Sequence, residues 1–247
     1  ALNKIFVLRR LGISTDEIKV ILSDNSNTAL QVVSVKKELQ LQREIAKNSI
    51  LDQLSNGKSF DEISEELQTL ENSKTITEKI LDAFPGYYGR FVCLHFVQFL
   101  NEPIKTADQQ AAYETVVAFL DNAPTLDLPE ELQEYLAEGT KHIGTEQIKD
   151  MVESTRKSME NPDDFLSQNK EVLEQYLAYK QSDEYKTSPA YKIMELMKEF
   201  NKTSGYYDVF IPALKQLSSS YAEYHIHIEA ANEKLLAQYP EISKLGN

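Results

Sequence analysis

The chain has 247 residues, long enough to bury the core of one large domain or two small ones. Glycine and proline occur only eight times each, a composition that favours helices over a β-sandwich or β-barrel. No apolar run reaches 18 residues, so we expect no membrane span, and no signal peptide opens the sequence. The single cysteine, Cys93, excludes an internal disulfide. We therefore expect an all-α protein of the cytoplasm.

The net charge of −13 is unevenly distributed along the chain. Residues 1–58 contain nine Lys and Arg against six Asp and Glu, so their net charge is +3 and that of residues 59–247 is −16. A body this acidic repels phosphate backbones, which argues against direct nucleic-acid binding by residues 59–247. The excess of Asp and Glu in residues 59–247 is typical of a solvated protein surface. The alternative is that these residues favour the binding of cationic ligands.

The first 22 residues predict two short helices joined by a tight turn. Gly12 ends the first helix, and Ser14 begins the second, with acidic residues in its first turn. Apolar residues at helical spacing give each helix one buried face. In the first helix these residues are Leu2, Ile5, Phe6, Leu8 and Leu11, and in the second they are Ile13, Ile18, Ile21 and Leu22.

This helix pair resembles the second helix pair in the winged-helix DNA-binding domain of MerR-family transcriptional regulators. The matching positions are Leu8, Arg9, Leu11, Gly12, Ser14, Glu17, Ile18 and Lys19. Ile13 replaces the usual Phe of the family, and Thr15 replaces the usual Leu. The resemblance implies that residues 1–22 are the remnant of such a domain, whose helix-turn-helix and wing would precede Ala1.

The resemblance also implies a function. MerR-like regulators bind promoter DNA as homodimers, sense an effector through a C-terminal domain, and change the DNA twist so that RNA polymerase can use the promoter. Lys4, Arg9 and Arg10 are the basic residues of the first helix, and they are candidates for contacts with DNA phosphates. Helix solubility explains these three residues equally well.

Residues 28–56 predict one long amphipathic helix without Gly or Pro. Val32, Val35, Leu39 and Ala46 follow a heptad seam, so the helix needs a partner helix. In MerR-like proteins the corresponding helix forms an antiparallel coil between protomers, and we expect a dimer here. Packing of this helix against its own chain is the alternative.

Residues 59–247 predict one compact multi-helix domain, which the resemblance makes the effector-binding domain. Helix starts are indicated at Ser59, at Thr75 and again in the apolar stretch 87–100, which a buried strand would also fit. Further helices are expected over 106–120, 129–138, 145–159, 162–180, 189–201 and 209–239, the last of them bent near Pro212.

No motif for catalysis, nucleotide binding or metal binding is present in the sequence. His225 and His227 would share a face on a strand, but they diverge on the helix expected here, so we predict no metal site and no cofactor. No nucleophile–base pair is recognisable, and we expect no enzymatic activity.

Aromatic residues are abundant, with 13 Tyr and 10 Phe but no Trp. Buried tyrosines need partners for their hydroxyls and often line ligand cavities, where stacking and cation–π contacts suit planar or cationic organic molecules. The predicted effector pocket consists of Tyr87, Tyr88, Phe91, His95, Tyr206 and Tyr207. The alternative function is a helical protein-interaction module without a small-molecule ligand.

Overall fold

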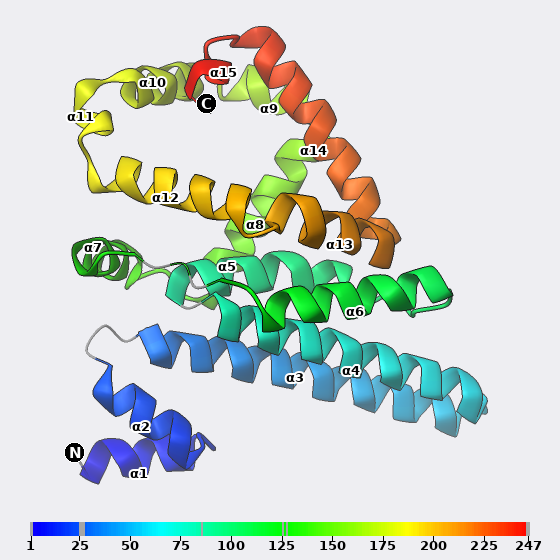
Figure 1. The fold of residues 1–247 in the computed structure, drawn as a ribbon. Helices are drawn as coiled ribbons and strands as arrows, with labels where there is room; N and C mark the ends of the chain where they lie inside the picture. Colours follow the sequence, from blue (N-terminus) through cyan, green and yellow to red (C-terminus); the bar gives the residue numbers. More distant parts are fainter. Residues whose placement is uncertain (1, 25–27, 85, 125, 127, 246–247) are drawn as a thin grey trace. The chain divides into compact units, whose positions relative to one another are not determined.

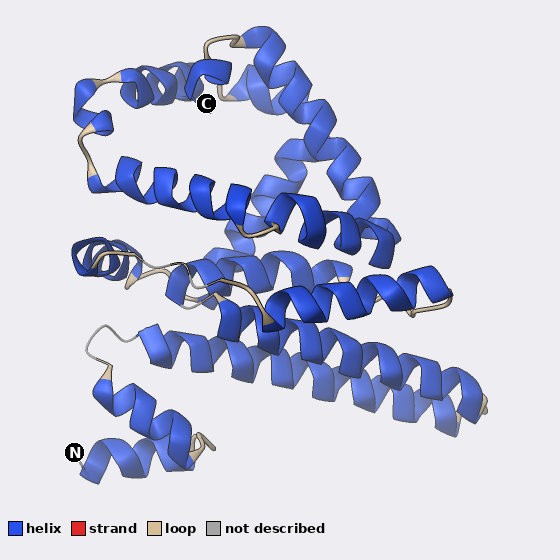
Figure 2. Cartoon of the chain, viewed as in Figure 1, coloured by secondary structure: helices blue, strands red, loops and turns tan. Residues whose placement is uncertain are grey.

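The computed structural model describes residues 2–24, 28–84, 86–124, 126 and 128–245. Every regular element in these residues is a helix, which confirms the all-α prediction (Figures 1 and 2). Contacts divide the chain into two compact units, which we call unit 1 (residues 1–103 and 129–149) and unit 2 (residues 104–128 and 150–247). None of the described helices combines the length and apolar content needed to cross a membrane.

Unit 1 begins with the predicted pair of short helices, α1 (Leu2–Arg10) and α2 (Thr15–Ser23). Gly12 has a φ of 70°, the left-handed conformation that ends a helix at low cost when the residue is glycine. The Ser14 hydroxyl accepts a hydrogen bond from the Glu17 amide, and the Glu17 carboxylate accepts one from the Ser14 amide. Leu8, Ile13 and Ile18 form an apolar cluster between the two helices.

The long helix α3 (Thr28–Ser55) is continuous, as predicted, and packs against α2, α4 and α5 of its own chain. Val35 is fully buried, Leu39 is 4% exposed, and Val32 and Ala46 are partly buried. Two of the four predicted seam residues, Val35 and Leu39, are therefore buried in the core of unit 1 by packing within their own chain.

Helix α4 (Phe60–Ala83) begins at the predicted capping box, in which Ser59 and Glu62 cap each other's backbone amides. The predicted second start at Thr75 is wrong, because α4 continues through it without a break. The hydroxyl of Thr75 donates to the Glu71 carbonyl, and that of Thr77 donates to the Ser73 carbonyl. Threonines that bond to the preceding turn are compatible with the interior of a helix.

The apolar stretch after α4 is helical, as predicted, and forms α5 (Gly86–Phe96) followed by a 3₁₀ turn, η1 (Val97–Phe99). Three consecutive residues of α5, Val92 to Leu94, are buried. Helix α7 (Glu130–Thr140) and the first residues of α8 (Thr145–Glu160) complete unit 1. The segment 59–247, expected as one compact domain, is thus shared between the two units.

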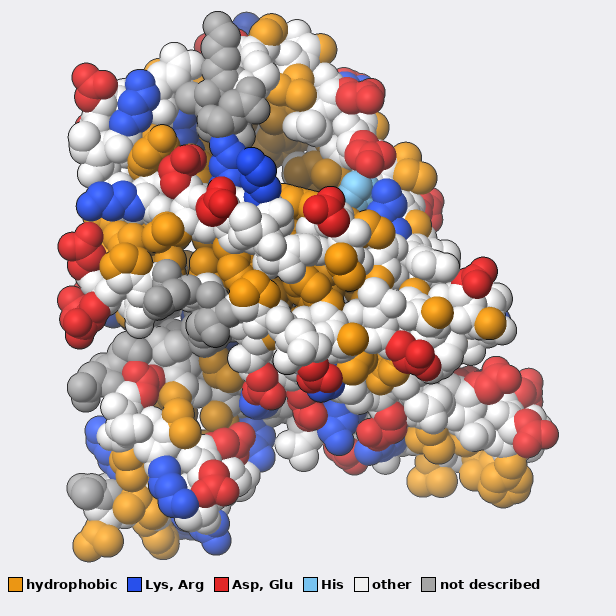
Figure 3. Space-filling model, viewed as in Figure 1, with side chains coloured by type: hydrophobic (Ala, Val, Ile, Leu, Met, Phe, Trp, Pro, Cys, Tyr) orange, Lys and Arg blue, Asp and Glu red, His pale blue; other side chains and the backbone are white. Residues whose placement is uncertain are grey.

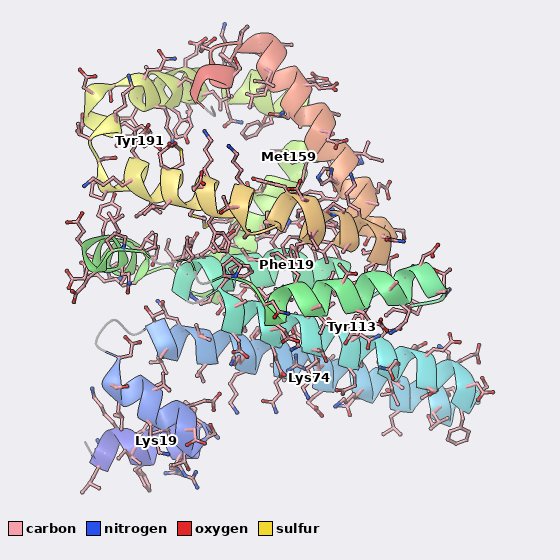
Figure 4. All side chains as sticks on the ribbon, viewed as in Figure 1. Lys19, Lys74, Tyr113, Phe119, Met159 and Tyr191 are labelled. Atoms are coloured by element: carbon pink, nitrogen blue, oxygen red, sulfur yellow. The ribbon has the colours of Figure 1, made fainter. Side chains whose placement is uncertain are left out.

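Unit 2 contains α6, the rest of α8 and all later elements, of which α6 and α13 pack against each other. Its elements besides α8 are α6 (Ala107–Asp121), α9 (Pro162–Gln168), α10 (Lys170–Gln181), α11 (Asp183–Lys186), α12 (Pro189–Thr203), the π-helix η2 (Tyr206–Phe210), α13 (Ile211–Leu217), α14 (Ser219–Gln238) and α15 (Ile242–Leu245). Phe119 of α6 packs against η2, where its ring is 4.9 Å from that of Phe210 (Figure 4).

Two helices of unit 2 differ from their predicted bounds. The helix expected over 162–180 is divided at Asn169 into α9 and α10. The last long helix breaks at Ser218 and not near Pro212, because Pro212 is the second residue of α13, where its missing amide is tolerated. Ser218 leaves the helical conformation and caps the next helix by accepting a hydrogen bond from the Tyr221 amide.

Candidate functional site

The three basic residues of α1 that could contact DNA phosphates are all exposed. The Arg9 guanidinium donates to the Thr15 hydroxyl at 3.0 Å, and the Arg10 guanidinium lies 5.6 Å from the centre of the Phe6 ring. Lys4 lies on the same helix. These residues leave positive charge at the surface of the helix pair, the arrangement that a phosphate contact requires.

The six predicted pocket residues fall into two groups, one in each unit. Tyr87, Tyr88, Phe91 and His95 lie on α5 in unit 1, whereas Tyr206 and Tyr207 lie on η2 in unit 2.

Three residues of the α5 group, Tyr87, Phe91 and His95, form a row along one face of the helix, whereas Tyr88 meets the Phe84 ring edge-on at 5.6 Å. The ring centres of Tyr87 and Phe91 are 6.4 Å apart, and Phe91 stacks on His95 at the same distance. Phe96 and Phe99 meet the His95 ring edge-on at 4.9 and 5.7 Å. The imidazole is therefore enclosed by aromatic rings, and this burial lowers the pKa of His95 to about 4.

The buried imidazole predicts that unit 1 loses stability in mild acid. The unfolded chain binds a proton at His95 near pH 6.5, whereas the native chain keeps this residue neutral down to about pH 4. The free energy of unfolding should therefore be fully present above pH 6.5 and fall as the pH drops from 6.5 to 4, by about 2 kcal/mol between pH 7.5 and 5.0. Urea denaturation at these two pH values measures the change.

His95→Gln removes this titration and should flatten the pH dependence by that amount. His142→Gln, at an exposed position, is the control and should retain the wild-type pH dependence. Equal pH dependence of His95→Gln and the wild-type chain would contradict a neutral, buried imidazole.

The two tyrosines of the η2 group directly follow a glycine in the left-handed conformation. Gly205 has a φ of 85° and begins the π-helix, in which the Tyr206 ring stacks on Phe210 at 5.5 Å and meets Tyr207 edge-on at 5.3 Å. Tyr207 is 59% exposed, so only Tyr206 packs into the unit 2 core.

Sequence reasoning did not single out Arg90, the largest fully buried side chain of the described residues. Its guanidinium donates from Nη1 to the Ile143 carbonyl at 2.9 Å and from Nη2 to the Gln31 side-chain oxygen at 2.8 Å. Burial lowers the pKa of Arg90, and the hydrogen-bonding partners found for its guanidinium are neutral. A lone arginine in the otherwise apolar stretch 87–100 was the available signal.

Arg90 is the centre of a set of bonds that joins α3 to the segment leading into α8. The Gln31 amide nitrogen donates to the Lys141 carbonyl at 3.0 Å. Lys149, on the first turns of α8, pairs with Glu38 of α3 at 2.7 Å, and this hydrogen bond lowers the pKa of Glu38. The first half of α3 is thus held against the start of the helix whose later residues belong to unit 2.

Unit 2 contains a group of four tyrosines and a methionine beside a lysine, which we call the tyrosine cage: Tyr176, Tyr179, Tyr185, Tyr191 and Met194. Tyr176, Tyr185 and Met194 contact the lysine, whereas Tyr179 and Tyr191 pack against Tyr185. Its lysine, Lys180, has its ammonium nitrogen 4.0 Å from the centre of the Tyr185 ring and 5.3 Å from that of Tyr176. These tyrosines were visible as a cluster in the sequence, but their spacing did not show that they surround a cation.

No group of three or more His, Cys, Asp or Glu side chains suited to a metal ion occurs in the described ranges. His225 and His227 lie on α14, where helical geometry directs them apart. His225 instead pairs with Glu229 on the next turn at 3.2 Å.

Comparison with models of known protein families, with curated proteins and with solved structures finds no match for this chain.

Proposed function

We propose that this chain is the dimerisation and effector-sensing part of a transcriptional regulator of the MerR type. In this proposal the protein is a homodimer without enzymatic activity. It responds to an organic effector bound by the helical region that follows α3 and acts on promoter DNA, and thereby on RNA polymerase. The observation that carries the proposal is the α1–α2 helix pair, which is followed in the chain by the 28-residue helix α3.

The helix pair supports the proposal because residues that carry the family resemblance have definite roles in it. Gly12 provides the left-handed turn, Ser14 and Glu17 form the capping box, and Leu8 and Ile18 pack in the small core. The Gly12 carbonyl also accepts a hydrogen bond from the Lys37 ammonium of α3 at 2.8 Å, which ties the turn to the long helix.

The surface of the α3–α4 hairpin supports self-association. Its most exposed apolar residues are Leu41, Ile45, Leu51 and Phe60, with exposed fractions of 57, 60, 62 and 77%. Figure 3 shows hydrophobic atoms gathered at the end of this hairpin. Because monomeric proteins rarely expose such groups together, we propose that a second copy covers this face, in place of the predicted seam at Val35 and Leu39.

A charge introduced into this face should prevent dimer formation. Replacing both Leu41 and Ile45 by Glu is expected to raise the dimer dissociation constant about 100-fold or more, because two buried apolar side chains per copy are lost. Val172→Glu, on α10 with 64% exposure, is the matched control and should leave the dimer unchanged. Sedimentation velocity over a range of concentrations measures the equilibrium.

The same exposed face favours the second candidate function, a helical protein-interaction module. A wild-type chain that remains monomeric at all concentrations would contradict the dimer and favour that module. The gene sequence distinguishes the two functions independently. The regulator requires an open reading frame before the codon of Ala1 that encodes a helix-turn-helix and a basic wing, and a start codon directly before Ala1 would overturn it.

A further inference from the structure

We propose that the tyrosine cage of unit 2 is a binding site for an organic ammonium ion, and that Lys180 occupies this site in the absence of such a ligand. The inference rests on the proposed function, because it names the chemical class of the effector.

The contacts of Lys180 are those of a cation site built from neutral groups. Its ammonium donates a hydrogen bond to the Tyr185 hydroxyl and contacts the Met194 sulfur at 3.8 Å. Its distance to the Tyr176 ring centre is within the range of cation–π interactions, whereas Tyr185 holds it through the hydroxyl. In the described residues, no carboxylate oxygen lies within 4.0 Å of this nitrogen, although the chain contains 39 Asp and Glu.

An alkylated ammonium can use the same groups as the lysine. Although burial desolvates Lys180, hydrogen bonds to the hydroxyls of Tyr185 and Tyr176 raise its pKa, so these groups stabilise a positive charge. A quaternary ammonium has no N–H groups to hydrate, and its methyl groups gain contacts with ring faces and sulfur. An organic cation therefore competes with Lys180 for the same site.

The cage is open on one side and closed on the other. Tyr176 and Tyr179 on α10 are 52 and 44% exposed, whereas Tyr185 on α11 is 4% exposed and forms the floor. Tyr185 meets Tyr179 and Tyr191 edge-on at 5.4 and 5.6 Å, which fixes its ring. In Figure 4, Tyr191 lies on the side of α12 that faces α10. A ligand can approach past Tyr176 while Lys180, on its flexible stem, moves out to solvent.

The test is to empty the cage and measure the binding of choline by isothermal titration calorimetry. Lys180→Ala removes the resident cation and should tighten choline binding at least tenfold relative to the wild-type chain. Lys170→Ala makes the same charge change elsewhere on α10, at an exposed ion pair with Glu174, and should bind like the wild-type chain. Lys180→Gln, which keeps the side-chain length, should also bind more tightly than the wild-type chain.

Two further measurements identify the interaction. The neutral isostere 3,3-dimethylbutan-1-ol should bind Lys180→Ala at least tenfold more weakly than choline does, because only choline carries a positive charge. Adding Tyr176→Leu at the open side of the cage should weaken choline binding again. Equal affinity of Lys180→Ala and Lys170→Ala for choline, or equal binding of choline and its isostere, would overturn the proposal. Since binding is measured without DNA, these results are independent of whether the gene encodes a helix-turn-helix.

Discussion

Replacing Gly89 by alanine is expected to destabilise the chain by about 3 kcal/mol or more. Gly89 lies in α5, where an added Cβ would overlap the Phe84 carbonyl oxygen and lie 2.6 Å from the Phe84 carbonyl carbon. The obstacle is backbone, not a flexible side chain, so the variant can fold only if the end of α4 moves relative to α5. The free energy of unfolding from urea denaturation gives the loss.

Gly139→Ala is the matched control for this substitution. Gly139 is also in a helix, α7, but nothing lies within 4 Å of its added Cβ. Alanine there should stabilise the chain by about 0.5 kcal/mol through helix propensity and the lower entropy of the unfolded state. Loss of stability in both variants, or in neither, would show that close packing against Phe84 does not decide the effect.

The sequence allowed the helices of this chain to be predicted wherever a local signal marks an end. Ser14, Ser59 and Thr106 each cap a helix in the structure, and Gly12 ends one in the left-handed conformation. These devices use hydrogen bonds within three or four residues, so they can be recognised without knowledge of the tertiary structure. The prediction failed at Thr75, where a residue type that often caps helices lies inside α4. Its hydroxyl donates a hydrogen bond to a carbonyl of the preceding turn.

Long-range arrangement was not accessible in the same way. The heptad pattern of α3 correctly indicated a partner helix, but it did not distinguish a second copy from α4 and α5, which bury Val35 and Leu39. Composition drew attention to aromatic residues, yet Tyr87 and Tyr206 belong to different units. Which rings gather around one cation depends on tertiary contacts between α10, α11 and α12, and no spacing within the sequence encodes these contacts.

Arg90 provides the second large expected effect. Replacing it by Met, which keeps the side-chain bulk and removes the charge, should lower the free energy of unfolding by about 3 kcal/mol. The Ile143 carbonyl and the Gln31 side-chain oxygen then lose their charged donor, and hydrogen bonds to charged groups contribute about 1.5–3 kcal/mol each. The relief of a desolvated guanidinium offsets part of this loss. Arg90→Lys should recover only part of the lost free energy of unfolding, because one ammonium cannot reproduce the two hydrogen bonds that Nη1 and Nη2 of the guanidinium donate.

The comparison that decides whether burial or ion pairing controls this loss is Arg156→Met. Arg156 pairs with two carboxylates, those of Glu153 and Glu160, but its side chain is 34% exposed. Exposed ion pairs contribute little, so this variant should lose about 0.5 kcal/mol, although it breaks more salt bridges than Arg90→Met. Hydrogen exchange of the amides over 141–149 should accelerate in Arg90→Met alone, because Arg90 holds the Ile143 carbonyl and its partner Gln31 holds that of Lys141. A larger loss of unfolding free energy in Arg156→Met than in Arg90→Met would contradict this role of Arg90. Unchanged hydrogen exchange over 141–149 in Arg90→Met would show that Arg90 does not hold the start of α8 against α3.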